Sequence, residues 1–169
     1  EHLLKKGVKQ NDAVLVVSKN TPETIEALLA IFNIGAIAVP ISPTSGTDLI
    51  KYAISVTKPV ACIAESFDEL LSSCDIKIKL DEIESLERTE LVIYEYDPNQ
   101  KAIILFTSGS TGNPKAIFRT HRTLSNFVNH IRNFYTDDPY ISDSFPHIVL
   151  LSVSHIGGFL DVMTPLSLG

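Results

Sequence analysis

Apolar residues near the start of the chain alternate between a strand-like run and a helix-like repeat. Val14–Ser18 is a short apolar run between polar residues, the pattern of a buried strand. A helical spacing of i, i+3, i+4 and i+7 follows at Ile25, Leu28, Leu29 and Phe32. Thr21 is a suitable N-cap for that helix and Gly35 a suitable left-handed end. With a second strand at Ala36–Val39, the pattern predicts a β-α-β unit with parallel strands.

The same alternation continues through the next forty residues. Thr47–Val56 is predicted to be a second helix, which Lys58-Pro59 ends, and Val60–Ala64 a third strand. A less regular acidic region then suggests a helix near Phe67–Ser73 and a strand near Ile76–Leu80. The fold class is therefore predicted to be α/β, with an open, mostly parallel sheet flanked by helices.

The second half of the chain predicts a hairpin, a helix and one more strand. Ala102–Thr107 and Ala116–Thr120 are β-prone runs, and Thr123–Tyr135 carries apolar residues at helical spacing. Ile148–Val153 is interpreted as a buried strand. It would place His155 at the carboxyl edge of the sheet, where open α/β folds bind their ligands.

The segment joining the hairpin strands, Thr107–Lys115, has the sequence TSGSTGNPK. Its glycines leave the backbone free to approach a ligand closely. Its hydroxyls and backbone N–H groups are suited to phosphate oxygens, and Lys115 adds a compact positive charge. We therefore predict a loop that binds the phosphates of a nucleotide.

The spacing excludes an ordinary P-loop NTPase. The Walker A pattern G-x-x-x-x-G-K-[ST], counted from Gly109, places its second glycine where Pro114 stands. Ala116 follows Lys115, so the hydroxyl that would bind magnesium is missing from that position. The G-x-S-x-G and G-x-G-x-x-G patterns of hydrolases and dinucleotide-binding folds are also absent from the sequence.

Two segments resemble the adenylate-forming superfamily of acyl- and aryl-CoA synthetases, beetle luciferases and peptide-synthetase adenylation domains. The string T-S-G-S-T-G-x-P-K resembles its signature loop, although Ala116 stands where the family usually has glycine. Ala27–Pro43 (ALLAIFNIGAIAVPISP) resembles the segment after the family's first strand. Within the superfamily, the sequences of these motifs most resemble the acyl-CoA synthetase and luciferase-like branch.

This resemblance implies ATP-dependent activation of a carboxylic acid as an acyl-adenylate, with release of pyrophosphate. ATP with Mg²⁺ would be required, and coenzyme A would then accept the acyl group. The residues implied to bind the ATP phosphates are Thr107, Ser108, Gly109, Ser110, Thr111, Gly112 and Lys115, with Thr111 also near the magnesium ion. The residues implied to line the pocket for the acid are His155, Gly157 and Gly158.

The resemblance covers only the front part of the family's fold. Residues 1–169 are expected to be an incomplete N-terminal AMP-binding domain, in part because the chain does not begin with Met. The adenine motif, the ribose-binding aspartate and the C-terminal lid with its catalytic lysine are expected after Gly169. No catalytic residue is therefore expected within the chain, and the isolated 169 residues are expected to be inactive.

Composition narrows the function classes further. The net charge is −6, from 14 basic and 20 acidic residues without a basic stripe, which argues against a nucleic-acid partner. The apolar runs are too short to be expected to span a bilayer, and the sequence does not open with a signal-peptide pattern. Cys62 and Cys74 lack a CxxC pattern, so a reduced intracellular setting is expected, cytoplasmic or peroxisomal. A disulfide between the two cysteines stays open.

Several alternatives remain at this point. A catalytically inactive nucleotide-binding relative fits the same loop, and so does a structural α/β module. An adenylation domain or a luciferase-like oxidative enzyme would share the whole motif.

The segment Ser152–Ser154 lacks the proline that the family has before its pocket residue. Among the other polar residues, we expect His121 to be structural and His130 and His147 to lie on the surface. Arg119 and Arg122 are expected near the loop, as solvent-facing charges by default and as aids to phosphate binding in the alternative.

Overall fold

The computed structural model describes residues 1–84, 95, 97–107, 114–136 and 148–168. The helices are α1 (His2–Lys5), α2 (Pro22–Asn33), α3 (Thr47–Thr57), α4 (Leu80–Glu84), α5 (His121–Thr136) and α6 (Ile156–Leu168). The strands are β1 (Ala13–Val17), β2 (Ile37–Ile41), β3 (Ala61–Ala64), β4 (Ile76–Lys79), β5 (Lys101–Thr107) and β6 (Lys115–Thr120). Two short 3₁₀ turns, η1 (Pro43–Ser45) and η2 (Leu71–Ser73), complete the described elements.

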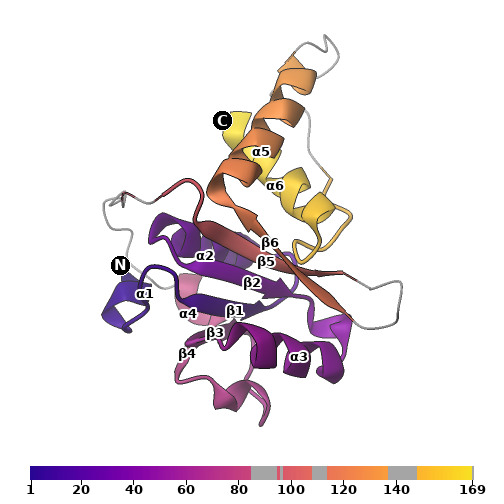
Figure 1. Ribbon diagram of the computed structural model, residues 1–169. Coiled ribbons are helices and arrows are strands. Elements are labelled where there is room, and N and C mark those ends of the chain that lie inside the picture. The colour runs from indigo at the N-terminus through magenta and orange to yellow at the C-terminus, as the bar shows by residue number, and fades with distance from the viewer. Residues whose placement is uncertain (85–94, 96, 108–113, 137–147, 169) are drawn as a thin grey trace.

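The strands form one sheet in the order β4-β3-β1-β2-β5-β6 (Figure 1). Neighbouring strands from β4 to β5 are parallel, whereas β6 runs antiparallel to β5. The predicted mixed α/β fold with a mostly parallel sheet is therefore confirmed. Because β1 to β5 all run the same way, their carboxyl ends share one edge of the sheet, and β5 ends there at the start of the predicted phosphate loop.

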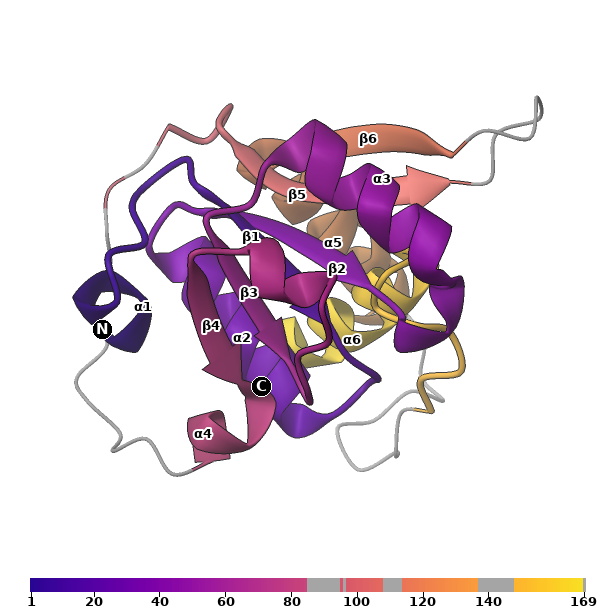
Figure 2. The ribbon, with the colours of Figure 1, turned by 90° about the horizontal axis from the view of Figure 1, so that it is seen from below.

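Helices cover the two faces of the sheet, and β1 contributes to both cores. Val14 and Val16 pack into the cluster under α2, while Leu15 and Val17 pack into the cluster under α3. Figure 2 shows α3 on one side of the sheet and α5 and α6 on the other. Full burial of such side chains contributes about 1.5–3 kcal/mol each, so β1 is held firmly by the cores on both faces of the sheet.

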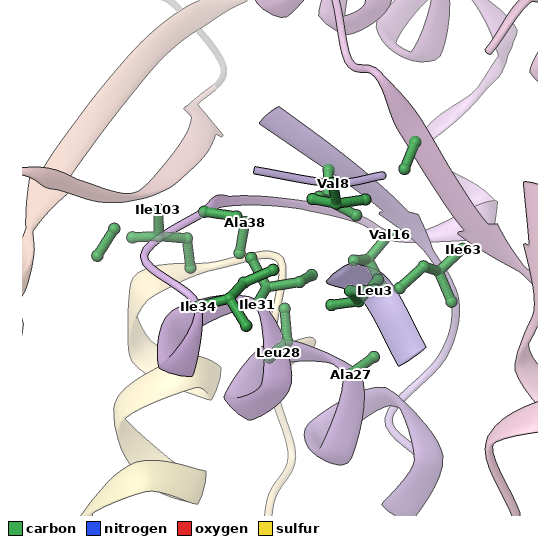
Figure 3. Close-up of a cluster of buried hydrophobic side chains, with 14 of the residues drawn as sticks. Leu3, Val8, Val16, Ala27, Leu28, Ile31, Ile34, Ala38, Ile63 and Ile103 are labelled. Atoms are coloured by element: carbon green, nitrogen blue, oxygen red, sulfur yellow. The ribbon is translucent and has the colours of Figure 1, made fainter. Parts of the chain in front are cut away.

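The α2 helix connects the core with the carboxyl edge of the sheet. Its buried residues Ala27, Leu28 and Ile31 point toward the sheet, as Figure 3 shows. Its N-cap is Thr21, whose hydroxyl accepts a hydrogen bond from the Thr24 backbone N–H at 3.3 Å. Gly35 follows the helix with a φ of +67°, so the predicted left-handed ending is confirmed. The helix therefore begins and ends where its sequence signals stand.

Two sequence predictions about this architecture are wrong. The segment 148–153 is not a strand: it crosses the carboxyl end of β1 instead of pairing beside an edge strand, and Ile148 and Leu150 are 76% and 85% exposed. Helix α6, which follows this segment, was not predicted. The helix expected near Phe67–Ser73 is only the 3₁₀ turn η2.

Candidate functional site

The predicted phosphate loop joins two strand ends that lie side by side. Thr107 at the end of β5 is the register partner of Lys115 at the start of β6, and both residues are exposed. Ser108, Gly109, Ser110, Thr111 and Gly112 lie outside the described residues. The hairpin thus holds Lys115 at the carboxyl edge of the parallel strands, with its ammonium group accessible to solvent. Phosphate binding by this loop stays a prediction.

The segment that carries His155 lies at the same edge, above the end of β1. Asn20, which follows β1, donates from its side-chain amide to the Leu151 carbonyl at 2.8 Å. The amide oxygen of Asn20 accepts from the Val153 backbone N–H at 3.0 Å. The sequence pattern did not single out Asn20. The available signal was a polar amide three residues after the end of a buried strand, at the edge where α/β folds bind ligands.

His155 is the residue from which α6 begins. Its carbonyl accepts the first helical hydrogen bond, from the Phe159 N–H at 2.9 Å, and its side chain is exposed. Ser152 fixes the preceding turn, because its hydroxyl accepts from the Ser154 N–H at 3.2 Å and its carbonyl from the His155 N–H at 2.9 Å. The imidazole is therefore presented to solvent by a tight turn rather than by a strand end.

The two glycines after His155 have different surroundings. A Cβ atom at Gly158 would lie 2.3 Å from the Ser152 carbonyl oxygen and 2.5 Å from that of Leu151. A Cβ at Gly157 would meet only the Leu151 side chain, at 3.1 Å. Gly158 therefore lets α6 pack against its own leading segment, a structural reason for glycine there that was not anticipated. The pocket role of both glycines stays a prediction.

The family model of the AMP-binding enzyme matches residues 1–169 of the chain. The chain belongs to the AMP-binding enzyme family. The predicted resemblance to adenylate-forming enzymes is confirmed, and the six-stranded, mostly parallel sheet matches the N-terminal domain of that fold.

Curated relatives of this AMP-binding chain include multidomain peptide synthetases. Malpinin synthetase from Mortierella alpina is 27% identical over 135 residues, which cover 77% of this chain and 2% of the relative. A dimodular nonribosomal peptide synthase from Bacillus subtilis (strain 168) is 29% identical over 136 residues, covering 75% of this chain and 6% of the relative. The chain spans only a small part of these proteins.

Solved structures with the same fold include a CoA synthetase and a luciferase-like enzyme. O-succinylbenzoate coenzyme A synthetase from Bacillus subtilis, in complex with AMP, matches with a TM-score of 0.79 at 22% identity, covering 97% of this chain and 43% of that one. The luciferase-like enzyme from the nonluminescent Zophobas morio mealworm matches with a TM-score of 0.75 at 23% identity, covering 96% of this chain and 41% of that one. The AMP-binding chain therefore corresponds in fold to less than half of either protein.

The two arginines expected near the loop lie at the opposite end of the hairpin, so that prediction is wrong. Arg119 pairs opposite Ile103 on β5, four residues beyond Lys115. The Arg122 side chain donates to the Asn99 side-chain oxygen at 2.9 Å and so ties the start of α5 to the turn before β5. His130 is exposed as expected, and His147 lies outside the described residues.

His121 is structural, as predicted, and packs where α5 begins. Its ring meets Phe32 edge-on, with 6.0 Å between the ring centroids. Burial lowers the pKa of His121 below its ordinary value near 6.5. Its environment therefore favours the neutral imidazole.

This burial predicts a pH dependence of stability. Between the lowered pKa and about 6.5 the unfolded chain binds a proton at His121 that the folded chain does not. The free energy of unfolding should therefore fall as the pH decreases below about 6.5, and His121→Asn should reduce that slope. Urea unfolding at several pH values between 7 and 5 measures both proteins. Equal slopes in the two proteins would contradict the assignment to His121.

Cys62 and Cys74 are both buried and free, in the core under α3. A hydrogen bond between the two thiols, together with burial, raises the pKa of Cys62. Cys62 is thus a core residue, and its thiol remains protonated. Within the described residues no helix is long and apolar enough to cross a membrane.

Proposed function

We propose that the protein uses ATP to activate a carboxylic acid. A carboxylate oxygen attacks the α-phosphorus, the bond from that phosphorus to the bridging oxygen breaks, and pyrophosphate leaves as the acyl-adenylate forms. The observation that carries this proposal is the T-S-G-S-T-G-x-P-K string, which connects two strands at the carboxyl edge of an AMP-binding fold. Such a reaction depends mainly on positioning and on stabilising the developing phosphate charge.

The described residues at the sheet edge support assigning separate residues to the ATP phosphates and to magnesium. The backbone of Lys115 is held by its pairing with Thr107 in the β5–β6 ladder. The ladder therefore fixes the point from which the lysine side chain extends. We assign Thr107, Lys115 and residues 108–112 between them to the phosphates. Magnesium, when bound with ATP, would add positive charge among the phosphate oxygens, and Thr111 is the residue we assign to it. A structural neighbour, the B. subtilis O-succinylbenzoate CoA synthetase, has been solved with ATP and magnesium ion.

Replacing Lys115 by alanine tests the phosphate-binding role. One charge-assisted hydrogen bond contributes about 1.5–3 kcal/mol, so kcat/KM for ATP–pyrophosphate exchange should fall about 10- to 100-fold in the full-length protein. Lys101→Ala is the matched control, because this lysine lies on the same hairpin at the end away from Lys115. Its ammonium group is 5.1 Å from the Phe118 ring centroid. Equal effects of the two substitutions would rule out a specific role for Lys115.

We further propose that coenzyme A accepts the acyl group as a thioester. The fold similarity to a CoA synthetase supports this step. An alternative supported by the curated relatives is an adenylation domain that loads an amino acid onto a carrier-protein thiol. Pyrophosphate exchange with panels of amino acids, fatty acids and aryl acids would distinguish the substrate classes. AMP release that depends on coenzyme A would identify the acceptor, whereas loading only of a carrier protein would favour the alternative.

A further inference from the structure

One side-chain amide connects the His155 segment to the parallel sheet. Asn20 bonds to Leu151 and Val153 at 2.8 and 3.0 Å, although these residues are more than 130 positions away in the chain. In the part of the chain that the structure describes, these are the hydrogen bonds that join residues 148–155 to the end of a sheet strand. The remaining bonds of that segment, through Ser152 and from the Phe159 N–H to the His155 carbonyl, are local.

Asn20 is itself presented by a rigid turn. The Thr24 side chain is 1% exposed, and its hydroxyl lies 2.8 Å from both the Ser18 hydroxyl and the Lys19 carbonyl. The Thr21 hydroxyl, 3.1 Å from that of Thr24, joins the same network at the start of α2. The backbone on both sides of Asn20 is therefore fixed by buried and part-buried hydrogen bonds and by the core packing of β1 and α2.

Beyond the Asn20 contacts the segment has a buried part and an exposed part. Val153 and Ser154 are 1% and 8% exposed, whereas Leu151 is 51% exposed and the His155 side chain faces solvent. The amide of Asn20 holds the N–H of Val153, and His155 is only two residues further along. Whatever fixes Val153 therefore also limits the positions that the imidazole can take.

We propose that Asn20 is a positioning residue for the carboxylic-acid subsite, acting through Leu151 and Val153 on His155. This inference rests on the proposed function, and it adds a residue that contacts neither the acid nor ATP. Asn20 pairs with a carbonyl and an N–H at once, as a strand neighbour would do. The segment, which is not itself a strand, is thereby aligned with the sheet edge that also carries the phosphate loop.

Asn20→Ala and Asn20→Asp in the full-length protein test this role by ATP–pyrophosphate exchange. Alanine removes both hydrogen bonds, and the aspartate carboxylate, of the same shape, cannot donate to the Leu151 carbonyl. We expect each variant to raise KM for the acid about tenfold, with KM for ATP unchanged. Ile78→Val, in the core of β4 at the far edge of the sheet, is the control for general destabilisation and should leave both KM values unchanged.

Hydrogen exchange of the Val153 amide provides a readout that does not depend on turnover. Exchange should be about fivefold faster in Asn20→Ala than in the parent protein, and unchanged in Ile78→Val. An unchanged rate in Asn20→Ala would show that Asn20 does not hold the segment, and a wild-type KM for the acid in both Asn20 variants would remove its role in the subsite. Failure of the parent protein to exchange pyrophosphate with any acid would instead overturn the proposed function and the subsite role together. The amide measurement would still decide whether Asn20 holds the segment.

Discussion

Phe159→Ala is expected to lower the free energy of unfolding by about 3–5 kcal/mol. The Phe159 side chain is 2% exposed and is among the largest fully buried side chains of the described chain. It meets Phe32 of α2 edge-on, with 5.8 Å between ring centroids, so the substitution removes an aromatic pair and leaves a cavity between α6 and α2. Urea unfolding followed by circular dichroism measures the loss.

The same helix supplies a matched control for this prediction. Leu166 lies on α6 with 55% of its side chain exposed, so Leu166→Ala should change the free energy of unfolding by less than about 0.5 kcal/mol. Comparable losses for the two variants would show that α6 is not anchored through Phe159. The contact of Phe159 with α2 would then be incidental to the stability of the domain.

Gly158→Ala is expected to destabilise the protein by about 2–3 kcal/mol, the upper part of the range for overpacked positions. The new methyl group would have to occupy space 2.3 Å from the Ser152 carbonyl oxygen, and backbone cannot rotate away as a side chain can. We therefore expect α6 and the Leu151–Ser152 segment to move apart. The midpoint of urea unfolding measures the effect.

Gly157→Ala separates this clash from the general preference of helices for alanine. At Gly157 the nearest atom is the end of the Leu151 side chain, at 3.1 Å, and that side chain is half exposed and free to move. Alanine is favoured over glycine inside a helix by about 1 kcal/mol, so Gly157→Ala should be neutral or stabilising. A destabilisation equal to that of Gly158→Ala would contradict the packing role of Gly158.

The early strands and the α2 helix could be predicted from the sequence because the signals for these elements are local. The α2 helix has an apolar repeat, a threonine cap and a terminal glycine, all within about four turns of chain. Helix α6 lacked such signals, since Gly157, Gly158 and Pro165 all lower helix propensity. We attribute its formation to burial of Phe159, a tertiary contact that no local pattern reveals. The apolar run 148–153 misled in the opposite way, because composition does not show whether a sheet edge is available to pair with it.

The candidate site divides in the same manner. The proposed phosphate loop is recognisable because glycine, hydroxyl and lysine residues at that spacing are suited to phosphate oxygens. Asn20 is not recognisable, because its partners are backbone groups of Leu151 and Val153, and every residue type carries those groups. Its distance from them along the chain removes any local pattern as well. Only the folded chain shows that the amide and its partners meet.

The order of strands turns β2 into a spacer. Only β2 separates β1, whose end lies beside the His155 segment, from β5, whose end opens the proposed phosphate loop. Two strand intervals amount to about 10 Å, because β1 pairs with β2 and β2 pairs with β5 in the same sheet. Changes in the surrounding loops can widen or narrow either proposed subsite without changing the distance between the ends of β1 and β5. Under the proposed function, larger acids would extend away from the sheet edge, and diversity of substrate is expected in the segments that surround this interval.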